Sequence, residues 1–297
     1  MEINKYQNSL CKSQYLLNKH LFKALPNYAV IKGIPLSNLA YNSCSARKCS
    51  DIDILVSRKD IYDCEKILHE YGYQQFNYKR QDKIFCLTNS HQVPVFYKKI
   101  YDENLYIDLN FEILWGEYEG KRIDVEEFLS DTIEMEIYGV KIKTLPPLKA
   151  MVQLILHHYK DMNSIFILAT RNSIKFDMFN DIYNLLKNNL DKITMNQLYA
   201  IISTYEIIPY VFYILYYTSQ VFNDEILRQY IDAFWTPEGE ALLNCYGLCS
   251  KERKKWRCDF KTRLEADNLY ELIKNDLSEQ DCEKIEINKR IFMGGFE

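Results

Sequence analysis

Glycine, long apolar runs and an excess of basic residues are scarce or missing in this sequence. Only 9 of its 297 residues are glycine, which argues against a glycine-rich dinucleotide-binding fold. Because no run of about 18 consecutive apolar residues occurs, we expect no transmembrane helix and no membrane partner. The formal net charge of −4 provides no overall positive potential for non-specific binding of nucleic acid, so only a local basic patch would support such a partner.

Paired cysteine spacing is also missing. The nine cysteines include two loose clusters, Cys44/Cys49 and Cys245/Cys249/Cys258, and neither has C-x-x-C spacing or a nearby histidine. We therefore expect no structural zinc site at these cysteines. The first residues lack the continuous apolar core of a signal peptide. These features predict a cytoplasmic protein with reduced cysteines.

The length and the aromatic content indicate a two-domain, helix-rich protein. A chain of 297 residues can bury a sizeable core, and its 47% hydrophobic and 26% charged residues are ordinary for a globular protein. The 24 tyrosines and 15 phenylalanines favour aromatic packing between helices.

Helical and strand patterns alternate over the first 145 residues. We expect helices over 4–25, 35–41 and 60–71, the last closed by Gly72 in the left-handed conformation. Alternation and apolar runs predict strands over 28–31, 51–56, 83–87, 93–98 and 105–112, and a hairpin over 134–142. We expect 83–87 and 93–98 to be antiparallel neighbours.

Only helical patterns follow Pro146. They cover residues 148–159, 176–188, 195–205, 209–222 and 224–234, so we place a domain boundary between 1–145 and 146–297. Residues 250–297 are charged and predict either a peripheral helix or a partly mobile segment. The tyrosine-rich stretch 205–217 could stack a nucleobase, but core packing is the favoured interpretation.

Two aspartates share one face of a predicted strand. Because successive strand side chains point to opposite faces, Asp51 and Asp53 project together, while Ile52 and Ile54 project into the core. Asp108 lies on a second strand whose apolar and polar residues alternate almost without fault. The three carboxylates are therefore candidates for one common site.

Three carboxylates on neighbouring strands offer the oxygen ligands that Mg²⁺ prefers. Residues two apart lie about 6.5–7 Å from each other along a strand, close enough to hold two ions about 3.5–4 Å apart. Such ion pairs stabilise the attacking and leaving oxygens of a phosphoryl or nucleotidyl transfer. Asp108 would then be the candidate general base toward an acceptor hydroxyl. The alternative interpretation makes Asp51 a turn cap and Asp108 a solvated strand residue.

These residues resemble the active-site signature of the nucleotidyltransferase superfamily typified by DNA polymerase beta. Within it, the chain is similar to an uncharacterised bacterial nucleotidyltransferase family with a Lys-Gly turn, an Arg-x-x-x-Asp-Ile-Asp strand and an Ile-Asp-Leu strand. The corresponding residues are Lys32-Gly33, Arg47, Asp51-Ile52-Asp53, Gly72-Tyr73 and Ile107-Asp108-Leu109-Asn110-Phe111. The resemblance covers roughly residues 20–220 and is most specific in the first 110.

The resemblance implies that Asp51 and Asp53 bind both ions and that Asp108 completes the site. It implies that Gly33 lets backbone amides approach a nucleotide triphosphate, and that Arg47 and Ser50 contact phosphate. Lys32 is a further phosphate candidate or a solvated strand end, and Arg47 could instead pair with Asp51.

The chain departs from the family pattern at two places. Ile34 follows the glycine of the turn, where the superfamily commonly has serine or glycine, so a phosphate-binding hydroxyl is missing. Asn110-Phe111 stands where the family often has His-Trp. Asn110 and Glu112 share the Asp108 face and either line the cleft or are solvated.

The histidines His157 and His158 belong to the softer part of the resemblance. Adjacent residues are about 100° apart on a helix, so we do not expect both to face one metal ion. We expect at least one of them in the core or in an interface.

The resemblance implies an α+β fold, with a small mixed β-sheet nucleotidyltransferase core flanked by helices and followed by an α-helical acceptor-binding domain. It implies a Mg²⁺-dependent transfer of a nucleoside monophosphate, most often AMP from ATP, to an acceptor, with release of pyrophosphate. The acceptor could be a small molecule, a peptide or protein, or RNA. Alternatives are a tRNA- or protein-modifying toxin of the abortive-infection type and a catalytically inactive nucleotide-binding module. The sequence leaves the acceptor, the base and the oligomeric state open.

Overall fold

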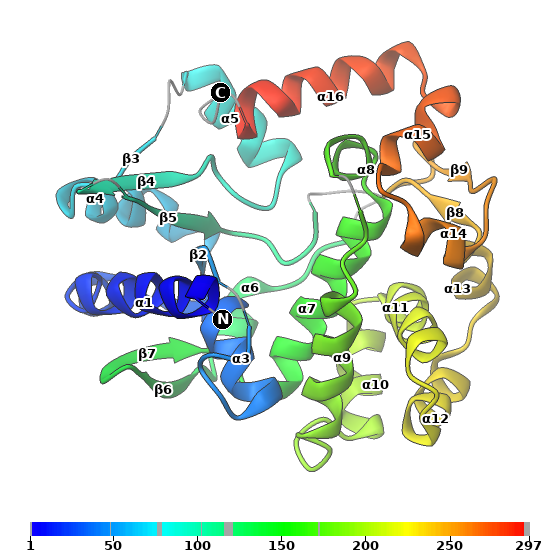
Figure 1. Cartoon of the computed structure of the whole chain (residues 1–297), viewed down its shortest axis with the longest axis horizontal. Coiled ribbons are helices and arrows are strands. Elements are labelled where there is room, and N and C mark those ends of the chain that lie inside the picture. Colours follow the sequence, from blue (N-terminus) through cyan, green and yellow to red (C-terminus); the bar gives the residue numbers. More distant parts are fainter. Residues whose placement is uncertain are drawn as a thin grey trace. The chain divides into compact units, whose positions relative to one another are not determined.

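The computed structural model in Figure 1 describes residues 2–47, 49–75, 79–101, 103–115, 121–171 and 173–293. These residues divide into two compact units, one formed by 1–116 and 123–150 and the other by 117–122 and 151–297. Lys48, which lies between Arg47 and Asp51, and residues 294–297, at the end of the predicted charged segment, lie outside the described part.

A seven-stranded mixed sheet forms the centre of the first unit. Its strands are β1 Tyr28–Ile31, β2 Asp51–Val56, β3 Gln74–Gln75, β4 Phe96–Ile100, β5 Glu103–Asn110, β6 Ile133–Ile137 and β7 Val140–Thr144. They are ordered β3-β4-β5-β2-β1-β7-β6. The pairs β2–β5 and β1–β7 are parallel, and the other neighbours are antiparallel. The predicted α+β class with a small mixed sheet is confirmed.

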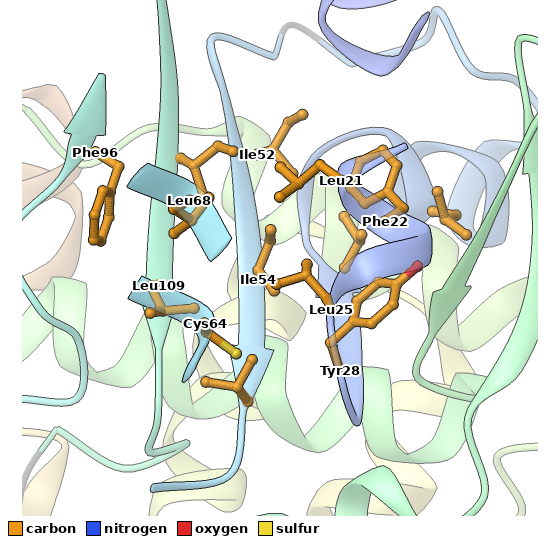
Figure 2. Close-up of a cluster of buried hydrophobic side chains, with 14 of the residues drawn as sticks. Leu21, Phe22, Leu25, Tyr28, Ile52, Ile54, Cys64, Leu68, Phe96 and Leu109 are labelled. Carbon is orange, nitrogen blue, oxygen red and sulfur yellow. The ribbon is translucent and has the colours of Figure 1, made fainter. Parts of the chain in front are cut away.

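Apolar side chains of the central strands build the core of this unit, in which β1 and β2 are buried along almost their whole length. Ile52 and Ile54 of β2 are fully buried and lie among Leu21, Leu25 and Leu68 (Figure 2). Burying each such side chain stabilises the fold by about 1.5–3 kcal/mol. The apolar face of β2 is therefore held against the core, and its other face is left for the aspartates.

Short helices surround the sheet of the first unit. They are α1 Glu2–Leu17, α2 Leu21–Ala24, α3 Gly33–Tyr41, the 3₁₀ helix η1 Arg58–Asp60, α4 Ile61–Glu70, α5 Arg80–Asn89 and α6 Val125–Leu129. The predicted cap after α4 is confirmed, since Gly72 has φ +83°. The predicted hairpin is also confirmed, with Tyr138 at φ 52° and Gly139 at φ +79° in the turn between β6 and β7.

Two predictions for this unit are wrong. Residues 83–87 were predicted as a strand but form part of helix α5. A short apolar run does not distinguish a strand from a helix. The start of α5 is stabilised by a capping box, in which the Lys79 amide donates a hydrogen bond to the Asp82 carboxylate. Strand β4 consequently pairs with β3 and β5 instead. The predicted helix over 4–25 is divided into α1 and α2, where the Asn18 amide bonds the Gln14 carbonyl at 2.9 Å.

Helices dominate the second unit, as predicted. They are α7 Pro147–Asn163, α8 Ile165–Thr170, α9 Asp177–Lys187, α10 Met195–Thr204, α11 Ile208–Val221, α12 Glu225–Phe234, α13 Pro237–Leu242, α14 Phe260–Glu265, α15 Leu269–Ile273, the 3₁₀ helix η2 Lys274–Asp276 and α16 Glu279–Phe292. The first turn of α7 belongs to the first unit. A short antiparallel ribbon of β8 Cys245–Tyr246 and β9 Lys254–Lys255 was not foreseen. No helix in the described part of the chain has the length and apolarity needed to cross a membrane.

Aromatic side chains build the core of the second unit. Tyr210, Tyr213 and Tyr217 of α11 are buried, and the rings of Tyr213 and Tyr217 meet edge to face at 4.8 Å. Core packing of this stretch is thereby confirmed. In the charged segment after residue 250, Lys254 pairs with Asp281 of α16 at 2.8 Å, and the buried Arg263 stacks on Tyr217.

Asp224 connects α9 to the start of α12. Its carboxylate accepts hydrogen bonds from Lys187 at 2.6 Å, from the Tyr183 hydroxyl at 2.8 Å and from the Ile226 amide at 2.8 Å. The bond from Lys187 contributes most to lowering the pKa of Asp224 to about 2. Because the pKa is depressed in the folded state, this carboxylate stabilises the fold above about pH 4 and loses that effect as the pH falls toward about 2.

We expect Asp224→Ala to lower the free energy of unfolding by about 1 kcal/mol near neutral pH, because α12 loses its amino-terminal cap. The difference from wild type should shrink as the pH falls below about 4, measured by urea unfolding at a series of pH values. Asp224→Asn is the control, since it keeps a capping oxygen and removes only the charge. If the stability difference between wild type and Asp224→Ala does not change with pH, the stabilising role of the ionised Asp224 carboxylate is contradicted.

Candidate active site

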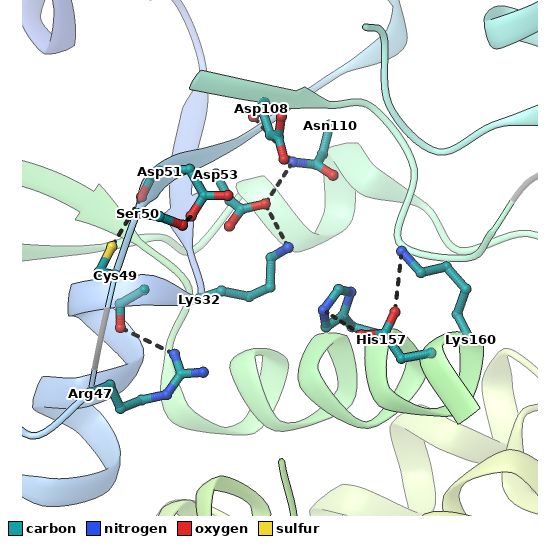
Figure 3. A network of polar contacts seen from close by, with 12 residues as sticks. Lys32, Arg47, Cys49, Ser50, Asp51, Asp53, Asp108, Asn110, His157 and Lys160 are labelled. Carbon is teal, nitrogen blue, oxygen red and sulfur yellow. Dashed lines mark hydrogen bonds and ion pairs between the residues drawn. The ribbon is translucent and has the colours of Figure 1, made fainter. Parts of the chain in front are cut away.

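The three predicted aspartates lie together on one face of the sheet. Asp53 of β2 and Asp108 of β5 are direct partners in the parallel register, and Asp51 lies two residues before Asp53 on the same face (Figure 3). Asp51 and Asp108 are half-buried, whereas Asp53 is only 5% exposed. The structure therefore brings together the carboxylates of Asp53 and Asp108, which are 55 residues apart in sequence (108 − 53).

Lys32 neutralises the most buried of these carboxylates. Its ammonium lies 2.5 Å from Asp53, which also accepts a long hydrogen bond of 3.5 Å from the Asn110 amide. Burial, together with the charge of Asp51, raises the pKa of Asp53 even though Lys32 opposes the shift. Burial alone would lower the pKa of Lys32, but the attraction of Asp53 and the other two aspartates raises it. Lys32 is therefore a partly buried cation, with its side chain 15% exposed, that contacts Asp53.

A strained turn places Lys32 at this position. Lys32 follows β1 with φ 57°, and Gly33 begins α3 with φ +44°. A Cβ atom on Gly33 would lie 3.0 Å from the Cys49 sulfur, so both the backbone conformation and the packing require glycine. The first turn of α3 has no side-chain cap, and because Pro35 has no amide hydrogen, the Gly33 and Ile34 amides lie at this helix end, which favours anions.

Arg47 and Ser50 flank the turn and the aspartates. The Arg47 guanidinium donates to the Gly33 carbonyl at 3.5 Å, and the Arg47 amide donates to the Ser37 hydroxyl at 3.2 Å. The Ser50 hydroxyl donates to the Asp51 carboxylate at 3.3 Å. Both predicted phosphate-binding side chains thus border the site.

Helix α1 supports the loop that carries these residues. The Cys11 thiol donates to the Cys49 carbonyl at 2.8 Å, and the Gln14 amide donates to the Ser50 carbonyl at 3.1 Å. The Cys49 thiol in turn donates to the Asp51 carbonyl at 3.0 Å, and its hydrogen bond with Cys11 and its burial raise its pKa. Sequence reasoning missed these supports, because no local pattern links α1 to a loop 38 residues away.

The positions where the chain departs from the family pattern have structural roles. Asn110 is buried and bonds both Asp53 and the Asp108 carbonyl, the latter at 3.2 Å. Glu112 is an ion-pair partner of Arg58 at 2.7 Å, and the Arg58 guanidinium also covers the Phe111 ring at 4.6 Å. Asn110 therefore belongs to the aspartate site, while Glu112 and Phe111 hold Arg58.

The donor set of the aspartate site fits a hard divalent cation. All three side chains offer carboxylate oxygens, the ligands that Mg²⁺ prefers, and they outnumber the single Lys32 ammonium. Asp51, Asp53 and Asp108 could hold Mg²⁺ in exchange for the contact that Lys32 makes with Asp53.

His158 is buried, as expected of at least one of the two histidines, and the possible ligand atoms of the pair lie closer together than their separation of about 100° on the helix suggests. Among the described residues, the one group of three possible ligands whose atoms all lie within 4.8 Å of one another is His157, His158 and Asp161. The histidines are three and four residues before Asp161, and both of these spacings place side chains on the same helix face. The H-H-x-x-D spacing is the signal that could have identified this group from the sequence.

Comparison with known proteins assigns the chain to a family. The model of a family described as uncharacterised nucleotidyltransferase matches residues 3–223, which confirms the resemblance inferred from the motifs. A solved structure of an antigenic nucleotidyltransferase-like protein from Paracoccidioides brasiliensis is 14% identical and has a TM-score of 0.36. That similarity covers 72% of this chain and 96% of the other, and it is too low to bear on function. No curated protein matches the chain.

We expect Gly33→Ala to destabilise the protein more than Gly139→Ala does. Both glycines have positive φ, so each substitution costs about 1 kcal/mol of backbone strain. A Cβ on Gly139 meets nothing within 4 Å, whereas one on Gly33 meets the Cys49 sulfur, which adds about 1 kcal/mol. Urea unfolding measures both losses. Adding Cys49→Ala to Gly33→Ala should restore the part of the unfolding free energy that the contact with the Cys49 sulfur removes. Equal losses of unfolding free energy for the two glycine variants would refute the packing argument.

We expect Lys32→Met to lower the free energy of unfolding by about 3 kcal/mol near neutral pH, because Asp53 loses its buried partner. The pKa of Asp53 then rises further. An acid with a raised folded-state pKa is destabilising above that pKa, so the loss should shrink as the pH is lowered toward about 4. Chemical unfolding at several pH values checks this, with Lys32→Met/Asp53→Asn as the compensated control. The pairing argument fails if the single and double variants are equally stable at neutral pH.

Proposed function

This chain belongs to the family of uncharacterised nucleotidyltransferases, and we propose that it transfers AMP from ATP to an acceptor with release of pyrophosphate. One observation carries the proposal: Asp51, Asp53 and Asp108 share one face of two parallel strands, beside the Lys32-Gly33 turn. Family membership supports nucleotidyl transfer in general, and this geometry supports the assignment of residues.

Asp51 and Asp53 would hold two Mg²⁺ ions, and Asp108 would complete the site. When bound, Mg²⁺ supplies positive charge that stabilises the attacking and leaving oxygens of the displacement. Lys32 favours the ionised form of the buried Asp53, because its ammonium opposes the rise in the pKa of that carboxyl that burial causes. This pairing prepares Asp53 to act as a ligand, since a protonated carboxyl is a poor one.

The turn and its neighbours would hold the triphosphate of the donor. The uncapped amides at the start of α3 offer hydrogen bonds and the positive end of the helix dipole. Arg47 can bind phosphate oxygens in a bidentate manner, and Ser50 adds a hydroxyl. Lys32 would contact phosphate once it is released from Asp53.

Asp108 would accept the proton of the acceptor. The acceptor hydroxyl oxygen attacks the α-phosphorus, the bond to the bridging oxygen breaks, and pyrophosphate leaves with the electron pair. Asp108 is half-buried and adjacent to Asp53 in the register, a position suited to a general base that faces an incoming substrate. We assign acceptor recognition to the helical residues 146–297.

Incubation of the protein with each of the four α-labelled nucleotides, Mg²⁺ and lysate of its own host tests this proposal. We expect label from ATP to appear in an acceptor whose size and nuclease or protease sensitivity show its class. Asp51→Asn, Asp53→Asn and Asp108→Asn should each lower the transfer rate by more than about 100-fold. Asp63→Asn, an exposed aspartate of α4, is the matched control and should transfer as wild type does.

Two results would overturn the proposal. Equal transfer by the wild type and the three site variants would remove the aspartates from the reaction. Tight nucleotide binding without transfer to any acceptor would favour the inactive nucleotide-binding module. Labelling of tRNA or of a host protein would instead direct the proposal to the abortive-infection toxin class.

A further inference from the structure

Helix α7 carries a second group of possible metal ligands, on residues that belong to the second unit. His157, His158 and Asp161 have ligand atoms that all lie within 4.8 Å of one another, and the two imidazole rings are 5.5 Å apart between centroids. Because both histidines are within one turn of Asp161, the helix backbone itself brings the three side chains together. This convergence needs no contact outside α7.

Burial and chemistry distinguish this group from the aspartate site. His158 and Asp161 are buried, while the His157 side chain is 18% exposed and opens the group to solvent on one side. Two imidazole nitrogens and one carboxylate oxygen suit Zn²⁺ and related transition metals, whereas Mg²⁺ prefers oxygen ligands alone. The two sites would therefore select different ions.

Cations already surround the Asp161 carboxylate. Arg171 forms an ion pair with its Oδ2 atom. His157 Nε2 lies 3.5 Å from the same atom, and Lys160 lies 3.9 Å from Oδ1; Figure 3 shows both His157 and Lys160. The simplest interpretation is a charge network in which Arg171 neutralises a buried acid. That network does not require two imidazoles to converge on one carboxylate. Arg171 could instead orient the carboxylate as metal ligands are commonly oriented, through a hydrogen bond to one oxygen.

We propose that His157, His158 and Asp161 form a transition-metal site that takes Zn²⁺, with one coordination position left for water or a substrate group. Three protein ligands with an open fourth position are the arrangement of zinc sites that also bind a further molecule. Lys160 lies 3.9 Å from Oδ1, beyond hydrogen-bond distance, so this contact leaves the oxygen free to act as a ligand. The site is separate from the proposed nucleotidyl transfer and does not depend on it.

Titration of metal-stripped full-length protein with Co²⁺ and then Zn²⁺ tests the site. We expect the visible d–d bands of tetrahedral Co²⁺ to saturate at one equivalent, to be displaced by Zn²⁺, and to persist in excess Mg²⁺. His157→Gln and Asp161→Asn should weaken Zn²⁺ binding by more than about 100-fold, since even second-shell changes cost about 10–100-fold. His20→Ala, an exposed histidine of the first unit, and Asp51→Asn should bind Zn²⁺ as wild type does.

The nine free cysteines make one further control necessary. Sulfur ligation of Co²⁺ produces intense charge-transfer bands in the near ultraviolet, and the appearance of such bands would overturn the proposal. It would also be overturned by the absence of d–d bands in wild type, or by unchanged binding in His157→Gln.

His157 is the most exposed of the three, so circular dichroism should show a folded His157→Gln variant even if Asp161→Asn is unstable. A rise in melting temperature with Zn²⁺ in wild type but not in His157→Gln would support the assignment.

Discussion

The ion pair between Lys32 and Asp53 is the interaction on which the first unit's site depends. Asp53 lies in the interior of the sheet, where an unpaired carboxylate would be costly, and Lys32 is the cation that compensates it. To reach Asp53, the chain adopts a left-handed turn at Lys32 and Gly33 immediately after β1. The same turn starts α3 and leaves room for no more than a glycine beside the Cys49 sulfur, so the ion pair and the backbone conformation occur together at one turn.

The site concentrates acidity at a cost to stability. Three carboxylates lie side by side on one face of β2 and β5, and the Lys32 ammonium offsets only part of their charge. A fold selected only for stability would place apolar residues there. Residues that are costly for folding are typical of functional sites. The supports from α1, through Cys11 and Gln14, show where stabilising contacts hold the strained loop in place.

Sequence patterns predicted most elements wherever local periodicity and packing agree. The alternation of β5, the hairpin of β6 and β7, and the longer helices α7 and α9 to α12 were visible in the sequence, because each buries one regular face. The short helices α8, α13, α14 and α15 were not predicted. Helix α5 was misread as a strand, since its five central residues offer an apolar run but too few turns to show a helical period. The metal-ligand geometry on α7 was missed because adjacent residues were considered without the partner one turn later.

The sequence by itself determined that Asp51 and Asp53 share a face and that Asp108 lies on a similar strand, because side chains alternate with a period of two along any strand. It also placed Asp161 three and four residues after the two histidines, spacings that share one helix face. Only the tertiary structure decided that Asp53 and Asp108 are register partners, that Lys32 reaches Asp53, and that α1 supports the loop between them. These relations join segments far apart in the chain, and their geometry is set by strand pairing and core packing, which no local pattern encodes.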